Sequence, residues 1–117
     1  MAAEHVLVIV SGDPETSHRT NEAIRIALGI IAGENDVTIA LLGPAAKVFS
    51  AEVEDYVDGE DTLKHIATLK KLGQTFHVER AVIPDDDNWN ADGPTMIPIS
   101  REDLAGLVAK SDRVLVF

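Results

Sequence analysis

Apolar residues in this chain follow two alternating patterns, short continuous runs and longer segments with helical spacing. The continuous runs His5–Val10 and Asp36–Leu42 are rich in β-branched residues, and each predicts a strand buried on both faces. Thr75–Val82 predicts a third strand, Met96–Ile99 a short fourth one, and Arg113–Phe117 a closing strand. We therefore expect a sheet of about four or five strands.

Three helices are predicted between these runs. Apolar residues recur at helical spacing over Thr20–Ala32. A second helix is expected from Thr62, acting as its N-cap, to Gly73 as its stop. The segment Ser100–Asp103, SRED, matches a capping box with Asp in the fourth place, and it predicts a helix that continues to Lys110.

This alternation of strands and helices is typical of an α/β fold. Right-handed crossovers between parallel strands place helices on both faces, so we expect a three-layer α/β/α domain with a mostly parallel sheet. At 117 residues the chain, 1–117, fits a single domain. Ligands of such folds bind beyond the carboxyl ends of the strands, which predicts that Ser11–His18 and Glu79–Trp89 lie side by side as the candidate site.

Net charge and composition argue against several classes of binding partner. The chain has 10 basic and 20 acidic residues, and its net charge of −10 repels nucleic-acid backbones and anionic lipids. We therefore expect neither nucleic acid nor a membrane as partner. The apolar run Val6–Val10 is too short to span a bilayer and has no basic segment before it, which argues against a signal peptide. A cytoplasmic location is the resulting expectation.

The first candidate segment follows the first predicted strand. Ser11, Gly12 and Asp13 occupy the place of a phosphate-binding loop, before a helix whose N-terminus attracts anions. The segment lacks the repeated glycines of a dinucleotide fingerprint, and Asp13 and Glu15 would repel phosphate. An ordinary turn is the favoured interpretation, with His18 at the helix start as a residue that could hold a small anion.

The second candidate segment follows the third predicted strand. Glu79 and Arg80 could position a polar substrate, with Glu79 as a general base, or they could form a simple ion pair. Trp89 is the only tryptophan and lies in a polar loop. We interpret its ring as a lid over a pocket or an anchor at an interface rather than as a core residue.

Metal-ligating residue types occur near the same loop. His77 and Glu79 share one face of the predicted strand, and Asp85–Asp87 follow shortly after it. The spacing matches no standard metal motif, and three consecutive aspartates are typical of a solvated loop. We therefore predict no metal and no other cofactor.

Three longer segments carry a family resemblance. They are VLVIVSGDPETSHRTNEAIRIALGI, a strand, a Ser-Gly-acidic turn and a helix; NDVTIALLGPAAKVF, a second strand with its Gly turn; and DLAGLVAKSDRVLVF, a last helix and strand. Together they resemble the DsrE/DsrF-like family of small sulfur-relay proteins over essentially the whole chain. The resemblance implies the α/β fold described above. It also implies assembly, because relatives form trimers, hexamers or heteromeric complexes.

The resemblance further implies a reactive cysteine. Family members that carry sulfur hold it on a cysteine in the loop after the third main strand, and alignment of FHVE with that strand puts Glu79 at or next to this position. The chain, however, contains no cysteine. Sulfur relay needs a thiolate that holds the sulfur as a persulfide. The chain therefore cannot itself carry persulfide sulfur.

Two functional hypotheses result. The preferred one is a non-catalytic binding or accessory protein that acts as a homo-oligomer, a trimer or hexamer, or as a subunit of a DsrE-like hetero-assembly. Its ligand or partner would bind through Ser11–His18 and Glu79–Trp89. The alternative is a small enzyme that uses Glu79, Arg80 and His18 for acid–base or metal-assisted chemistry on a small polar substrate.

Overall fold

The computed structural model describes residues 4–117, and its centre is a five-stranded sheet. The strands are β1 (His5–Val10), β2 (Asp36–Leu41), β3 (Phe76–Glu79), β4 (Met96–Ile99) and β5 (Arg113–Val116). They lie in the order β4-β3-β2-β1-β5, and each strand is parallel to its neighbours. The predicted α/β fold with a parallel sheet is confirmed.

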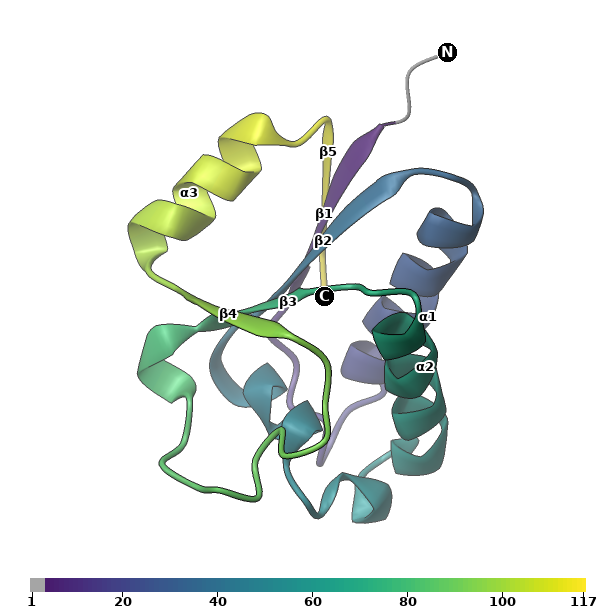
Figure 1. Ribbon diagram of the computed structural model, residues 1–117, viewed down its shortest axis with the longest axis vertical. Helices are drawn as coiled ribbons and strands as arrows, with labels where there is room; N and C mark the ends of the chain where they lie inside the picture. The colour runs from purple at the N-terminus through teal and green to yellow at the C-terminus, as the bar shows by residue number, and fades with distance from the viewer. Residues whose placement is uncertain (1–3) are drawn as a thin grey trace.

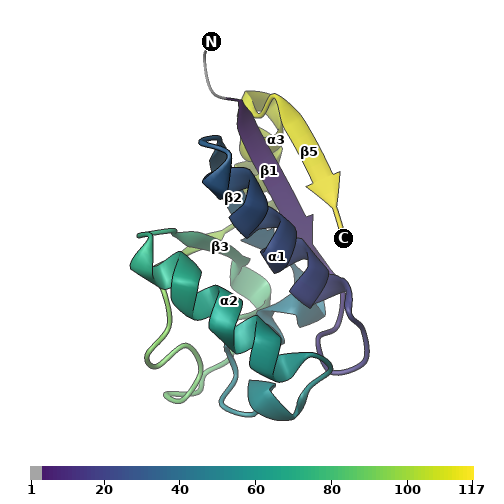
Figure 2. The same ribbon diagram turned by 90° about the vertical axis from the view of Figure 1, so that its right-hand side faces the viewer.

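Two helices cover one face of the sheet and a single helix covers the other (Figures 1 and 2). We call the face beneath α1 (Arg19–Ala32) and α2 (Gly59–Lys71) the first face, and the face beneath α3 (Arg101–Lys110) the second face. Short 3-10 helices complete the connections: η1 (Gly43–Phe49), η2 (Val53–Asp55) and η3 (Arg80–Val82). Within residues 4–117, no helix is long and apolar enough to cross a bilayer.

The first face carries the main core. Because successive side chains of a strand point to opposite faces, the pairing of Val8 with Ile39 places both of them under α1 and α2. They pack there with Ile24 of α1 and Leu69 of α2, and all four are fully buried. This face supplies most of the apolar burial that stabilises the domain.

The second face carries a smaller core. Its buried cluster consists of Leu7, Ala40 and Ile99, against which Leu104 and Leu107 of α3 pack. No residue of α3 itself is fully buried. The remaining apolar side chains of this face are partly open to solvent, so one helix does not cover it. The most exposed of them are Ile97, Val108, Val114 and Val116.

Two element boundaries differ from the sequence prediction. The second helix begins at Gly59, and Thr62 is not its cap but a buried residue inside it, whose hydroxyl donates to Asn21 Oδ1 at 3.1 Å. A Cβ on Gly59 would lie 2.0 Å from the carbonyl oxygen of Val53. The two backbone segments are therefore so close that only glycine fits at position 59. Strand β3 stops at Glu79, because Arg80 begins a 3-10 turn.

The start of α3 confirms the predicted capping box. The Asp103 backbone N–H donates to Ser100 Oγ at 3.1 Å, and the Ser100 backbone N–H donates to Asp103 Oδ2 at 2.9 Å. The Ser100 hydrogen bonds lower the pKa of Asp103, and the nearby Arg80 charge adds to this effect. The helix that covers the second face therefore has a well-defined first turn.

Candidate functional site

The two candidate loops both lie at the carboxyl edge of the sheet, but β2 lies between the strands they follow. The segment after β2, η1, therefore separates Ser11–His18 from Glu79. Lys47 of η1 reaches the first loop, where its ammonium lies 3.1 Å from Asp13 Oδ2 and 3.2 Å from Glu15 Oε1. The expectation that the two loops are side by side is wrong, because β2 and the η1 segment that follows it lie between them.

The polar groups of the first loop form hydrogen bonds and ion pairs with residues of this chain. The Glu15 backbone N–H donates to Asp13 Oδ1 at 3.0 Å and lowers the pKa of Asp13, and Lys47 lowers it further. The Gly12 carbonyl accepts from Thr20 Oγ1 at 2.9 Å. The hydroxyl of Ser11 donates to the Phe117 carbonyl. These contacts support the interpretation of an ordinary turn.

His18 lies at the start of α1 and faces the start of α2. Its Nδ1 lies 2.5 Å from Asp58 Oδ2, and this hydrogen bond raises the pKa of His18, with the Asp58 charge adding to the effect. The imidazole is 74% exposed. The pair joins the two helices of the first face at the solvent boundary.

Glu79 points to the second face and has a polar contact with the backbone. Its Oε1 accepts a hydrogen bond from the Gly43 N–H at 2.9 Å. Gly43 has φ +53°, a left-handed conformation that glycine adopts without a steric penalty. The half-buried carboxylate thus holds the turn between β2 and η1.

The Glu79 side chain also lines a hollow of about 600 Å³ beside α3, which we call the Glu79 hollow. Its polar rim contains Ser100 and Arg101 at the helix start. The walls are apolar, and they are formed by Leu42, Ile99, Leu104, Ala105 and Val108. A concave apolar space with a few polar groups at one end is typical of a small-ligand site.

A family model, that of the DsrE/DsrF-like family, matches residues 4–117. The chain belongs to the DsrE/DsrF-like family. Among solved structures, this DsrE-like chain is similar to the YchN protein from E. coli, with a TM-score of 0.70 and 14% sequence identity over 97% of this chain and 99% of that one. The likeness to YchN shows the fold. A comparison with curated proteins finds no match.

In this DsrE-like fold, Trp89 is a core residue. It is 8% exposed, its Nε1 donates to the Ala46 carbonyl at 2.8 Å, and its ring meets Phe49 edge-on at 5.6 Å between centroids. The expectation of a lid or an interface anchor is wrong, because η1 supplies both an apolar partner and a hydrogen-bond acceptor for the indole.

The side chains of the enzyme alternative are held apart in the DsrE-like chain. Glu79 is bonded to the Gly43 backbone and His18 to Asp58, and within residues 4–117 no hydrogen bond or ion pair joins Glu79 to His18 or Arg80. No group of three or more His, Asp or Glu side chains in the same range is placed to hold a metal ion. In the described residues, Glu79 therefore does not form an acid–base pair with His18 or Arg80.

The sequence reasoning missed one residue near the site, Lys47, and did not anticipate the burial of His77. Lys47 joins η1 to the first loop through Asp13 and Glu15, although nothing marks it in the chain. His77 faces α3, and its Nδ1 is buried without a hydrogen-bond partner, while burial lowers its pKa. The shared face of His77 and Glu79 was predicted from the alternation along the strand, and the structure agrees.

Proposed function

We propose that this chain is a non-catalytic, oligomeric member of the DsrE/DsrF-like family that binds a partner or a small ligand at the carboxyl edge of its sheet. The observation that carries this proposal is the absence of cysteine from all 117 residues. A persulfide carrier needs a thiolate nucleophile, and neither a thioether nor a hydroxyl replaces it. The fold is retained while the atom needed for sulfur relay is missing.

The surroundings of Glu79 support binding rather than catalysis. A general base must reach the proton that it removes, and its efficiency depends on a pKa near the working pH. Glu79 already accepts from the Gly43 N–H, and the other groups of the Glu79 hollow are mostly apolar. Such a hollow fits an apolar side chain or small ligand with one polar donor for the carboxylate.

The second face supports the oligomeric part of the proposal. Val116 is 64% exposed on β5, an edge strand of the sheet, and Val108 of α3 is also exposed. Edge strands with exposed apolar residues are prone to pair with other chains unless they are covered. A second subunit or a partner protein would remove this surface from water.

The test combines two measurements on the purified protein. Native mass spectrometry is expected to show an assembly of three or six chains, or a specific complex when a partner is co-expressed. Incubation with polysulfide is expected to leave the mass of the denatured chain unchanged. A stable adduct of added sulfur would contradict the non-catalytic assignment, and a monomer at all concentrations and with all partners would contradict the assembly.

A Glu79→Gln variant separates the hypotheses further. Gln keeps an acceptor for the Gly43 N–H, so we expect the variant to fold and assemble as the parent does. In the enzyme alternative, the same change would abolish turnover of a small polar substrate while leaving the assembly intact. Loss of turnover in E79Q would therefore favour that alternative over the proposal.

A further inference from the structure

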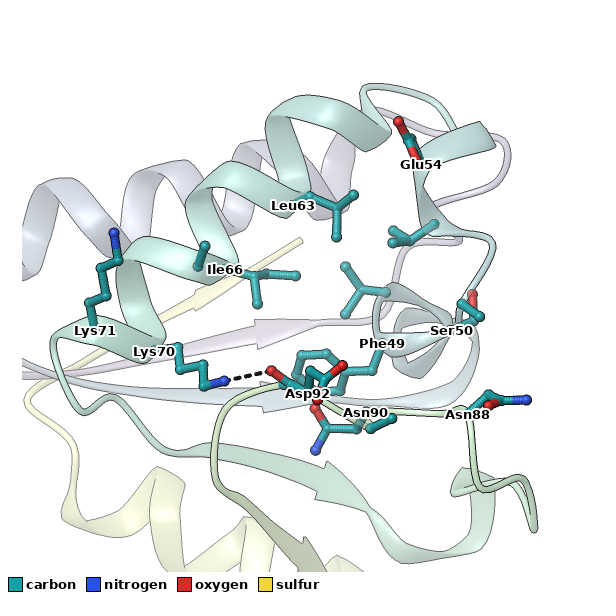
Figure 3. Close-up of a pocket in the computed structure, with 16 residues that line it drawn as sticks. Phe49, Ser50, Glu54, Leu63, Ile66, Lys70, Lys71, Asn88, Asn90 and Asp92 are labelled. Atoms are coloured by element: carbon teal, nitrogen blue, oxygen red, sulfur yellow. Dashed lines mark hydrogen bonds between the residues drawn. The ribbon is translucent and has the colours of Figure 1, made fainter.

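A hollow of about 790 Å³ lies between α2, the η1–η2 segment and the loop 88–93 (Figure 3). Its charged groups are engaged, balanced or turned away. Lys70 Nζ donates to the Asp92 carbonyl at 2.7 Å, and Figure 3 shows the Lys71 ammonium pointing away from the apolar side chains. Two carboxylates, those of Glu54 and Asp92, offset the two lysines. Because these charges offset one another, this hollow favours no class of ionic ligand.

The Glu79 hollow has a different arrangement, because its two ionisable residues come from neighbouring positions at one end. Strand pairing places Glu79 opposite Ile99, and Ser100 and Arg101 follow directly at the start of α3. Glu79 and Arg101 have opposite charges. The remaining walls are formed by the apolar residues Leu42, Ile99, Leu104, Ala105 and Val108. The space is therefore polar at the start of α3 and apolar further along this helix.

Both charged groups keep hydrogen-bonding capacity for a ligand. Glu79 Oε1 accepts from the Gly43 N–H at 2.9 Å, while within residues 4–117 no hydrogen bond reaches Oε2. The Arg101 guanidinium forms no hydrogen bond or ion pair with any other residue in this range. A carboxylate oxygen is an acceptor, and a guanidinium has only donors. An acceptor and a group of donors are thus available at the same end of the hollow.

A ligand with a single charge does not match this pair of residues. A cation is attracted by Glu79 and repelled by Arg101, and an anion experiences the reverse. A zwitterion matches both, since its ammonium donates to the free carboxylate oxygen and its carboxylate accepts from the guanidinium fork. An α-amino acid carries both charged groups on one carbon atom, and its side chain extends from the same carbon. An apolar amino acid therefore has the same polar end and apolar remainder as the hollow.

We propose that the Glu79 hollow binds a free apolar α-amino acid, with its ammonium at Glu79, its carboxylate at Arg101 and its side chain against the apolar walls. This inference rests on the proposed function, because it names the class of small ligand for the same site. The volume of about 600 Å³ lies within the range of about 300 to 1,000 Å³ that is usual for small-molecule sites. The walls favour leucine over glycine, because burial of an apolar side chain adds binding free energy.

The first test is a calorimetric titration of the full chain with L-leucine, glycine and two analogues of leucine. Isocaproate lacks the ammonium and isoamylamine lacks the carboxylate. Glycine should bind at least about tenfold more weakly than leucine. Each analogue should bind about fivefold more weakly, as expected for the loss of one ion pair that is open to solvent. Equal affinities for leucine and either analogue would overturn the assignment.

Backbone amide shifts locate the bound leucine. They should change at Ile99, Leu104 and Val108, which line the hollow. Changes confined to α2 and the loop 88–93 would place leucine in the other hollow and overturn the assignment.

Matched variants test the ammonium contact. Glu79→Gln should weaken leucine about fivefold without weakening isocaproate, which has no ammonium to lose. Glu102→Gln is the control, because it removes a carboxylate from the first turn of α3 that does not line the hollow. This control should leave both affinities unchanged. An equal loss of leucine affinity in E79Q and E102Q, or no loss in E79Q, would contradict the contact.

A second pair tests the carboxylate contact. Arg101→Gln should weaken leucine about fivefold without weakening isoamylamine, which has no carboxylate. Arg80→Gln removes an arginine next to Glu79 that does not line the hollow, and it should leave both affinities unchanged. Equal effects of R101Q and R80Q on leucine would contradict the proposed orientation.

Native mass spectrometry of the same samples separates this inference from the proposed function. An assembly that does not bind leucine would overturn the ligand and leave the non-catalytic oligomer standing. A monomer that binds leucine with the expected dependence on Glu79 and Arg101 would support the ligand and overturn the assembly. A sulfur adduct after incubation with polysulfide would contradict the non-catalytic assignment, whatever the affinity for leucine.

Discussion

The two faces of the sheet differ in how completely the chain covers them. On the first face, two long helices seal a core that extends from β5 to the aromatic residues Phe49, Phe76 and Trp89. On the second face, the ten residues of α3 cover a cluster of Leu7, Ala40 and Ile99. The first face therefore contributes most of the free energy of unfolding. The second face leaves apolar surface and the Glu79 hollow available to other molecules.

The largest effect is expected for Phe76→Ala on the first face. Phe76 is fully buried and meets Phe49 edge-on at 5.2 Å between ring centroids, so truncation removes apolar contact and leaves a cavity. The free energy of unfolding in urea should fall by about 3 to 5 kcal/mol. Val116→Ala on the second face is the control and should lower it by less than about 0.5 kcal/mol. Comparable losses would mean that the two faces contribute equally.

A smaller effect is expected at the start of α3. Ser100→Ala removes the hydroxyl that accepts from the Asp103 N–H, which should cost about 1 kcal/mol of unfolding free energy. Ser100→Asp keeps an acceptor at the same place and should restore most of this stability. If S100A and S100D were equally unstable, the capping hydrogen bond would not explain the loss.

Val116→Asp separates stability from assembly. The side chain is already largely exposed, so we expect the unfolding free energy of the dilute chain to change by less than about 0.5 kcal/mol. The same change places a charge in the proposed contact surface, and native mass spectrometry should show a shift towards monomer. Leu115→Asp, on the neighbouring residue that packs into the first face, should instead unfold the chain. An intact assembly in V116D would exclude β5 from the subunit contact.

The smallest effects concern two histidines whose pKa values move in opposite directions. The Asp58 hydrogen bond raises the pKa of His18 above its usual 6.5, so this pair adds stability below about pH 6.5 and loses it as the pH rises through the folded pKa. Burial lowers the pKa of His77, so its protonation in the unfolded chain reduces stability as the pH falls below 6.5.

A pH titration followed by the NMR shifts of the histidine ring protons should show a raised pKa for His18 and a lowered pKa for His77. Asp58→Asn should bring the pKa of His18 back towards 6.5 and leave that of His77 unchanged. His77→Phe should reduce the loss of stability on acidification from about pH 7 to pH 5. A His77 ring that titrates above 6.5 would show that it is not desolvated beneath α3.

The strands and helices were predictable because their signals are local. His5–Val10 is the first strand with the bounds that its apolar run predicts, and the SRED segment begins α3. The start of α2 was not predictable, since it depends on the close approach of Gly59 to the Val53 carbonyl across a turn. The end of β3 at Glu79, where Arg80 begins a 3-10 turn, carries no such local signal either.

The arrangement of the candidate site required tertiary information. The position of Glu79 at a carboxyl strand end follows from the pattern, but the strand order that places η1 beside it does not. Trp89 was misassigned because its neighbours in the sequence are polar, whereas its partners Ala46 and Phe49 come from η1. Polar context along a chain says little about an aromatic residue whose contacts are distant in sequence.

The hydrogen-bonded burial of Trp89 has an optical consequence. As the only tryptophan of the chain, it reports from one defined place, the junction of η1 with the loop 88–93. Its indole is shielded from water and packs edge-on against Phe49 of η1. Emission from the unlabelled protein should therefore shift to longer wavelength when this loop detaches, even while the strands and helices remain folded.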